Sequence, residues 1–290
     1  MAESGLVVVD KSPGMTSHDV VARVRRLAGT RKVGHAGTLD PMATGVLVLG
    51  VERATRLLGH LMLTEKAYDA TVRLGVSTTT DDAEGEVVAA TAADFLQPGL
   101  VDAEFGEQVG EIMQVPTAVS AIKVDGQRAY ARVRAGEQVE LKARPVTIHS
   151  LAVLDRRVVG DHLDVDISVR CSSGTYIRAI ARDVGVALGV GGHLTALRRT
   201  AVGPFDLSLA HTLDELADDF ALLPIAQAAR ASFASVDLDE ENAANVRFGR
   251  SLDLALDGTG PHALFAPGGE FLALYEPAGS RARPVAVFVG

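Results

Sequence analysis

The sequence predicts an α+β protein with one large domain and a small C-terminal module rich in β-strands. Strand-like and helix-like stretches are mixed along the 290 residues, without the steady alternation that builds a doubly wound parallel sheet. Nearly half of the residues are apolar, which is enough for a conventional core. The pattern changes after about residue 232, where strand signals punctuated by Gly and Pro follow one another. We therefore divide the chain into residues 1–231 and residues 232–290.

The N-terminal elements carry clear local signals. Residues 5–9 predict a strand, and Thr16 with Asp19 forms the pattern of a capping box at the start of a helix. Residues 46–51 are a short apolar run, as expected of a central strand. Residues 68–76 alternate between apolar and polar side chains, which predicts a strand with one buried face.

The same signals continue through the second half of the chain. Residues 163–171 again alternate, and the single cysteine, Cys171, falls on the apolar face, where we expect a buried thiol. A helix should follow Gly174, because apolar residues recur there at helical spacing. Thr212 and Glu215 form a second capping box. The small module is predicted to contain a short helix and three strands, at residues 262–266, 270–275 and 284–289.

Charge is distributed unevenly along the chain. The net charge of −9, taken alone, argues against a nucleic-acid partner, because phosphate binding relies on Lys and Arg. Residues 1–60 carry 8 basic and 5 acidic side chains and residues 142–200 carry 9 and 5, so these segments have net charges of +3 and +4. Residues 61–141 and 201–290 each carry −8. Because the local field steers a polyanion, the acidic total does not exclude RNA, but it predicts marked salt dependence.

Composition also gives expectations about location. The N-terminus lacks a basic region followed by a long apolar stretch, so it does not read as a signal peptide. No apolar run approaches the length of a membrane-spanning helix. A single cysteine excludes an internal disulfide framework and fits a reducing compartment. We expect a cytoplasmic protein without membrane contact, and a monomer by default.

One loop holds the residues best suited to chemistry. Residues 31–45 join the first helix to an apolar strand and contain three glycines, two threonines and a proline, so backbone groups are available for contact. Asp40 precedes Pro41, which favours an extended backbone at Asp40. Local reasoning alone favours an Asp40 that accepts hydrogen bonds from its own loop. A phosphate-binding loop is a weak alternative, because the Gly-Lys-Ser/Thr ending is missing.

The loop and four other segments resemble the motifs of the TruB family of tRNA pseudouridine synthases. The sequence GHAGTLDPMATGVL, which contains Asp40, resembles the catalytic signature of that family. The other matching segments are DKSPGMTS, KAY, SGTYIR and HLTALRR, and they occur in family order across residues 5–205. The resemblance implies a pseudouridine synthase fold, with a central mixed but largely antiparallel sheet flanked by helices and loops. It also implies a PUA-like RNA-binding module at the C-terminus.

The resemblance further implies the reaction and its catalytic residues. Uridine within RNA is isomerised: the bond from the base to the ribose breaks, and C5 of the base then bonds to the ribose. That chemistry requires no cofactor and no metal, and the histidines lie outside metal-ligand spacings. Asp40 supplies a carboxylate that either attacks the ribose or abstracts its 2′ proton, two possibilities that stay open. Arg178 pairs with Asp40 to keep it charged, and Tyr68 stacks on the target base.

Other residues are implied to bind the RNA. Tyr176 and Leu197 form further walls of the base pocket. His35 fills the position of the base that leaves its stack. Lys11 contacts phosphates, together with basic residues at positions 31, 32, 198 and 199. The implied substrate is the uridine at position 55 in the T-loop of elongator tRNAs, recognised through the T-stem-loop.

Two alternative functions lead to different expectations. A catalytically silent RNA-binding protein of this fold would lack Asp40 or Arg178, and both are present. A synthase guided by other subunits would carry longer basic extensions, which the sequence does not show. The chain departs from the family pattern in the threonine run at residues 78–80, although Asp82 matches the later acidic position. The C-terminal module matches weakly and is acidic, so we expect it to hold RNA weakly.

Overall fold

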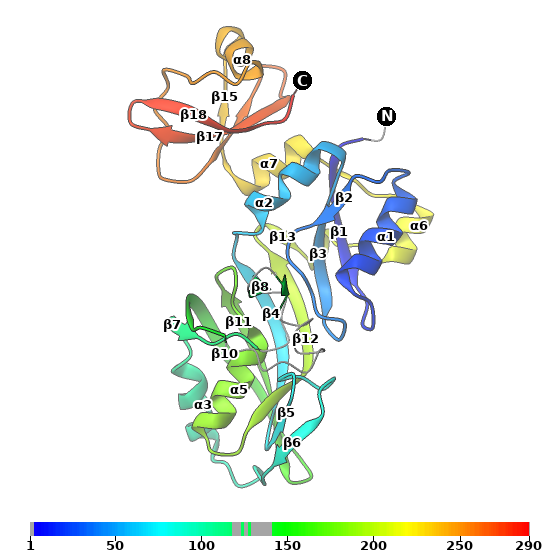
Figure 1. The fold of residues 1–290 in the computed structure, drawn as a ribbon, viewed down its shortest axis with the longest axis vertical. Helices are drawn as coiled ribbons and strands as arrows, with labels where there is room; N and C mark the ends of the chain where they lie inside the picture. Colours follow the sequence, from blue (N-terminus) through cyan, green and yellow to red (C-terminus); the bar gives the residue numbers. More distant parts are fainter. Residues whose placement is uncertain (1–2, 118–122, 125–126, 129–140, 290) are drawn as a thin grey trace.

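A computed structural model describes residues 3–117, 123–124, 127–128 and 141–289. The architecture is α+β, as predicted, with one large curled sheet and a small C-terminal sheet (Figure 1). The strands of the large sheet are β1 (Gly5–Lys11), β2 (Val33–His35), β3 (Thr44–Val51), β4 (Lys66–Leu74), β7 (Gly110–Gln114), β10 (Arg144–Val159), β11 (His162–Cys171), β12 (Gly192–Val202), β13 (Phe205–Asp206) and β14 (Leu223–Pro224).

The large sheet is mixed but largely antiparallel, which confirms the predicted type. Its main path runs in the order β14-β1-β3-β12-β4-β11-β10-β7. The pairing of β3 with β12 is parallel, and the other pairings on this path are antiparallel. Strand β12 therefore joins the N-terminal strands to the rest of the sheet. The HLTALRR motif at residues 193–199 is part of this central strand.

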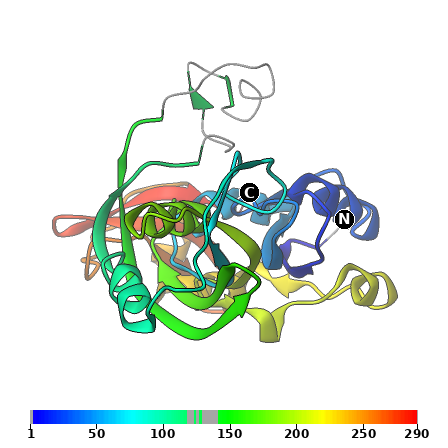
Figure 2. The same ribbon diagram turned by 90° about the horizontal axis from the view of Figure 1, so that it is seen from below.

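Helices cover the sheet, and those that follow Thr16, Gly174 and Thr212 begin near the signals predicted for them. The helices are α1 (Ser17–Leu27), α2 (Leu58–Leu61), α3 (Pro98–Gly106), α5 (Ile177–Ala187), α6 (Leu213–Asp218), α7 (Ile225–Ser232) and α8 (Glu240–Arg247), with short 3₁₀ turns at Glu52–Arg56 and Leu207–Leu209. Both predicted capping boxes are present, at the start of α1 and of α6. Helix α5 packs on β12 and β4, and α3 packs on β10 and α5, so the curled sheet wraps around these two helices (Figure 2).

One predicted strand is divided in two. Residues 68–76 read as a single alternating strand, but β4 ends at Leu74 and β5 (Val76–Thr78) pairs separately with β6 (Val87–Ala90). Gly75 lies between them with a φ of +107°, a conformation that side-chain-bearing residues rarely adopt. The remaining small sheet of the first half pairs β8 (Lys123–Val124) with β9 (Gln127–Arg128).

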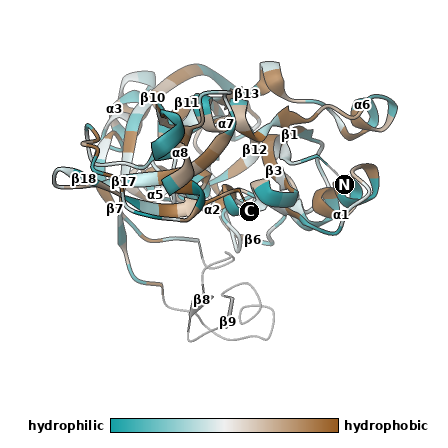
Figure 3. Cartoon of the chain, turned by 90° about the horizontal axis from the view of Figure 1, so that it is seen from above, coloured by the Kyte–Doolittle hydropathy of each residue, from teal (hydrophilic) through white to brown (hydrophobic). Residues whose placement is uncertain are grey.

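The core of the large sheet follows the predicted alternation. Val165, Ile167 and Val169 of β11 are buried in one apolar cluster with residues of the neighbouring strand β4. Cys171 is buried in the same cluster, as expected. In Figure 3 hydrophobic residues colour much of the central strands, whereas the outer side of α1 is hydrophilic. This packing fixes the positions of the strand ends from which the site is built.

The C-terminal sheet contains four strands and packs on helix α7, which in turn contacts β1. It comprises β15 (Ala234–Asp237), β16 (His262–Phe265), β17 (Phe271–Ala278) and β18 (Arg281–Val287), in that order. The last strand begins three residues before the predicted residue 284. An apolar cluster that includes Leu6, Leu61 and Phe288 joins this sheet to the large one. No helix in the described part of the chain is long and apolar enough to cross a membrane.

Candidate active site

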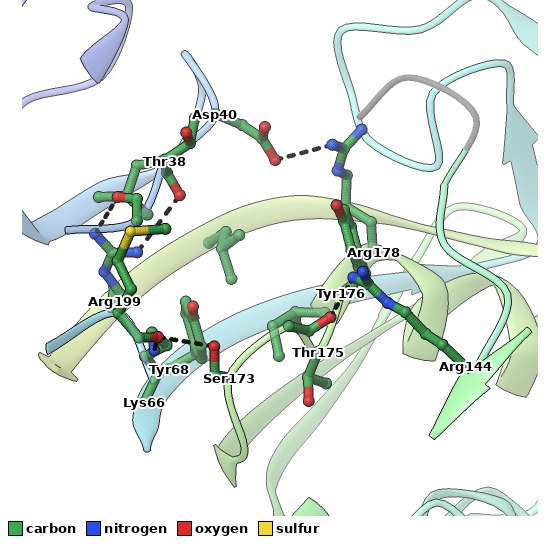
Figure 4. Close-up of a pocket in the computed structure, with 16 residues that line it drawn as sticks. Thr38, Asp40, Lys66, Tyr68, Arg144, Ser173, Thr175, Tyr176, Arg178 and Arg199 are labelled. Carbon is green, nitrogen blue, oxygen red and sulfur yellow. Dashed lines mark hydrogen bonds and ion pairs between the residues drawn. The ribbon is translucent and has the colours of Figure 1, made fainter. Parts of the chain in front are cut away.

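Asp40 faces Arg178 across the mouth of a cavity (Figure 4). The distance from Asp40 Oδ2 to Arg178 Nη2 is 3.1 Å. Asp40 lies in the loop between β2 and β3, and Arg178 lies in the first turn of α5, so the pair joins two distant parts of the chain. The Asp40 side chain points to this arginine, not back to the N–H groups of its own loop as local reasoning had favoured. The structure thus brings together the two residues predicted to pair.

Arg178 also binds a second carboxylate. Its Nη1 lies 3.1 Å from Asp82 Oδ2 and donates to the carbonyl oxygen of Thr80 at 2.8 Å. Asp82 is itself fixed, because its Oδ1 accepts from the Thr80 hydroxyl at 2.5 Å and from the Glu84 N–H at 3.1 Å. Only 5% of the Arg178 side chain and 3% of the Asp82 side chain are exposed. Residues 80–84 therefore hold the guanidinium in the orientation that meets Asp40.

The electrostatic balance at Asp40 depends on these neighbours. Burial raises the pKa of Asp40 above its ordinary value, and the Asp82 carboxylate adds to this increase. The positive charges of Arg178 and Lys11 act in the opposite direction and favour the charged carboxylate. The Asp40 side chain keeps 34% of its surface exposed, so a substrate in the cavity can still reach it. Asp40 thus combines a partly desolvated carboxylate with a fixed cation.

The cavity beside Asp40 has a volume of about 330 Å³ and is lined by three of the predicted base contacts. Tyr68 comes from β4, Leu197 from β12 and Tyr176 from the residue that precedes α5. Tyr68 and Leu197 lie in strands that are paired on both sides within the large sheet, and Tyr176 lies at the start of a helix. Their backbone positions are therefore set by the sheet and the helix. Burial raises the pKa of the Tyr68 hydroxyl, so this group keeps its proton at neutral pH.

Two buried cations form the other end of the cavity. Arg199 is almost fully buried and donates from Nε to the Val46 carbonyl oxygen at 2.7 Å and from Nη2 to the Gly37 carbonyl oxygen at 3.3 Å. Lys66 donates from Nζ to the carbonyl oxygens of Met62 at 2.8 Å and Thr64 at 2.6 Å, and burial lowers its pKa to about 8. Both side chains therefore hold the backbone that surrounds the cavity.

The close approach of the Arg199 backbone also requires a glycine at position 45. A Cβ atom on Gly45 would lie 2.2 Å from the Arg199 carbonyl oxygen, and Gly45 has a φ of +95°. Glycine is needed here because β3 approaches β12 closely at the start of their parallel pairing. The glycine at the end of the Asp40 loop thus anchors that loop to the central strand.

Side chains of two neighbouring strands contact the backbone and the ring of Tyr176. Gln114 accepts from the Tyr176 N–H at 2.8 Å and donates to the Tyr176 carbonyl oxygen at 3.1 Å. The Arg144 guanidinium lies 5.0 Å from the centre of the Tyr176 ring and donates to the Gly174 carbonyl oxygen at 2.6 Å. Gln114 is almost fully buried. These contacts fix the start of α5, and with it the place of Arg178.

Two predicted substrate contacts lie outside the lining of this cavity. His35 is in β2, and its ring meets the His18 ring edge-on at a centroid distance of 5.6 Å. Lys11 was expected to contact phosphates, but its side chain is buried. Its Nζ donates to the carbonyl oxygens of Ser12 at 3.0 Å and Pro41 at 3.2 Å. In this conformation Lys11 holds the Asp40 loop. Burial lowers the pKa of Lys11 to about 8.

Sequence reasoning placed some basic residues differently from the structure. Arg199, expected at phosphates, is buried in the cavity wall, and Arg198 pairs with Asp10 at 2.7 Å. Gln114 and Arg144 were missed, because neither lies in a motif that the sequence singled out. The strand registers that bring them to Tyr176 are long-range pairings and leave no local signal.

The arrangement suits acid–base or nucleophilic chemistry by a carboxylate on a flat, uncharged ligand. The cavity has apolar and aromatic walls that can enclose a flat ring, and the Asp40 carboxylate lies at its mouth. Within the described residues, no group of three or more His, Cys, Asp or Glu side chains could hold a metal ion.

Comparisons with known proteins identify the family of the chain. Residues 25–177 match the model described as TruB family pseudouridylate synthase (N terminal domain). Residues 178–229 match the tRNA pseudouridylate synthase B C-terminal domain, and residues 233–289 match tRNA pseudouridine synthase II, C terminal.

Similar proteins cover almost the whole chain. The tRNA pseudouridine synthase B of Nocardia farcinica is 60% identical over 284 residues, which cover 98% of this chain and 92% of that protein. That of Arthrobacter sp. (strain FB24) is 58% identical, with 98% and 96% covered. A solved Cbf5-Nop10-Gar1 complex contains a chain that superposes with a TM-score of 0.76 at 27% identity, covering 98% of this chain and 85% of that one. The chain therefore belongs to the TruB family of pseudouridylate synthases.

Proposed function

We propose that the protein converts uridine to pseudouridine at position 55 in the T-loop of tRNA, with Asp40 as its catalytic carboxylate. The observation that carries this proposal is the Asp40–Arg178 pair at the mouth of a cavity large enough for one base. The names of two similar relatives, both tRNA pseudouridine synthase B, support tRNA as the substrate.

The target base must leave its stack to reach this cavity, at a cost of a few kcal/mol. Tyr68, Tyr176 and Leu197 then bind the base on the cavity walls. We assign His35 to the position that the base vacates, because His35 lies just before the Asp40 loop and its ring can stack on a neighbouring base. These contacts orient the ribose toward Asp40.

The reaction then proceeds in two bond changes. The bond from N1 of the base to C1′ of the ribose breaks, and the base keeps the electron pair. After the base turns, C5 bonds to C1′, the proton on C5 is lost and N1 gains a proton, so the overall change is an isomerisation. Asp40 drives the first change in one of two ways. It attacks C1′ and forms an ester that breaks when C5 bonds to C1′, or it removes the 2′ proton and returns it to C2′ when C5 bonds to C1′. Arg178 stabilises the charged carboxylate before the substrate binds.

We further propose that residues 1–231 form the catalytic domain and residues 232–290 a PUA-like RNA-binding module. The four-stranded sheet β15–β18 with its own apolar cluster supports this division. A single chain supplies every residue assigned to the reaction, which supports a monomeric enzyme.

The experiment uses purified protein with an unmodified tRNA and with a T-stem-loop of about 17 nucleotides. Pseudouridine is mapped by carbodiimide treatment and primer extension. We expect product at position 55 in both RNAs, no product with Asp40→Asn, and full activity with Asp69→Asn, an exposed carboxylate of β4. Product at a different position would overturn the substrate assignment, and activity of Asp40→Asn would overturn the catalytic one.

A further inference from the structure

A second cavity lies on the other side of the segment that joins α2 to β4. Its volume is about 480 Å³. His60, Leu63 and Thr64 form one wall, and residues 257–262 of the C-terminal part form the opposite wall. Figure 1 shows α2 between the C-terminal sheet and the start of β4. None of the residues assigned to the reaction lines this cavity.

The two cavities share a wall. Met62 lines the Asp40 cavity, and its carbonyl oxygen accepts from Lys66 Nζ at 2.8 Å and from the Ser173 hydroxyl at 2.7 Å. The next two residues, Leu63 and Thr64, line the second cavity. Leu63 is 76% exposed and Met62 is 45% exposed, so the two form an apolar ridge between the cavities. A ligand that extends from one cavity to the other must cross this ridge.

Two flat side-chain rings, of His60 and Phe233, line the second cavity. The rings of His60 and Phe233 lie nearly perpendicular, with their centroids 6.4 Å apart. A planar base can stack on one ring and meet the edge of the other. Burial lowers the pKa of His60, so the ring is uncharged at neutral pH and suits a neutral partner.

The same cavity offers hydrogen-bonding groups. The carboxylates of Asp257 and Glu276 also line the cavity, and Glu276 accepts from Arg283 Nε at 2.6 Å. Carboxylates accept hydrogen bonds from the amino groups of bases, whereas they repel phosphates. This set therefore favours a base that carries an amino group over uracil and over a bare anion.

We propose that this second cavity binds an amino-bearing nucleobase of the RNA substrate, from a nucleotide close to the target uridine. The proposal rests on the proposed function, because it requires an RNA strand that enters the Asp40 cavity. Because the two cavities share a wall, the distance between them is short. The second base therefore comes from the same RNA loop as the target uridine. Leu63 supports the strand where it crosses the ridge, as apolar side chains do between unstacked bases.

The test measures dissociation constants for T-stem-loop RNAs in an Asp40→Asn background, so that the RNA is not converted. Ala234→Phe fills the cavity from an exposed position that lines it. Ala278→Phe, at an exposed position of the same sheet away from the cavity, is the matched control. We expect Ala234→Phe to weaken binding about tenfold, the effect of losing one stacked base. Ala278→Phe should leave binding unchanged.

A series of RNAs, each with one abasic loop nucleotide, then identifies the base. Removal of the correct base should weaken binding to the parent protein by the same factor but should not weaken binding to Ala234→Phe any further. Equal affinity of Ala234→Phe and the parent, or equal losses for both proteins at every abasic position, would overturn the second site.

Two controls keep these outcomes separate. Circular dichroism checks that Ala234→Phe is folded, and if it is not, His60→Ala and Leu63→Ala replace it because they only remove atoms. Pseudouridine mapping is independent of these measurements. Product at position 55, together with unchanged binding of the cavity variants, would overturn the second site and leave the proposed function intact.

Discussion

Arginine side chains are buried around Asp40 but exposed on the C-terminal sheet. Arg178 is 5% exposed and lies between two carboxylates. On the C-terminal sheet, Arg281 pairs with Asp253 at 2.8 Å, with side chains that are 54% and 89% exposed. Both regions contain ion pairs of similar length, but only in the second are both side chains mostly exposed.

This difference in burial indicates what the ion pairs of each region contribute. An exposed pair contributes at most about 1 kcal/mol to the free energy of unfolding. A buried pair has a large desolvation cost, and apolar residues of similar volume often stabilise a protein more. We therefore attribute the charges around Arg178 to the proposed function, and the exposed pairs to solubility. Substitutions in the two regions should have very different effects.

The largest effect is expected for Arg178→Lys. Lysine keeps the charge but cannot bind Asp40 and Asp82 from two nitrogens of one planar group, as the guanidinium does. Turnover of the T-stem-loop should fall about 10²–10³-fold, as for loss of one preorganised donor. Arg170→Lys, an exposed arginine of β11, is the control and should keep full turnover. Undiminished turnover of Arg178→Lys would mean that the buried pair is not needed for the reaction.

A smaller effect is expected for Gln114→Ala, which removes a buried but uncharged contact. The substitution leaves the N–H and carbonyl groups of Tyr176 without their side-chain partner. The free energy of unfolding, measured by urea denaturation, should fall by about 2–3 kcal/mol. Gln97→Ala, at an exposed position, should change it by less than about 0.5 kcal/mol. Equal stability of the two variants would show that the contact does not hold the start of α5.

The smallest effect is expected for Arg281→Ala on the C-terminal sheet. Both partners of this ion pair are solvated, so the free energy of unfolding should change by less than about 1 kcal/mol. Turnover should not change. A loss of several kcal/mol would contradict the distinction between the two regions.

Local signals in the sequence account for much of the fold. The capping boxes of α1 and α6 were predicted from Thr16 and Thr212, because a cap depends on residues three positions apart. The alternation in β11 predicted its buried face in the same way. The family resemblance was confirmed over nearly the whole chain, and it also directed attention to Asp40.

What could not be predicted depends on contacts between distant segments. The central position of β12 follows from its pairing with β3 and β4, which no local pattern encodes. The burial of Lys11 and Arg199 was missed for the same reason, because a basic residue reads as exposed until its carbonyl partners are known. Gln114 reaches Tyr176 only because β7 pairs with β10.

The most direct test of the account is the pH dependence of kcat/KM, measured with enzyme in excess. The acid limb reports the group that must be deprotonated in the free enzyme, which is Asp40 in the proposed mechanism. Because Arg178 lowers the pKa of Asp40 and Asp82 raises it, Arg178→Met should move the acid limb to higher pH and Asp82→Asn should move it to lower pH. An acid limb that stays at the wild-type pH in both variants, or moves in the same direction in both, would contradict the role of Asp40.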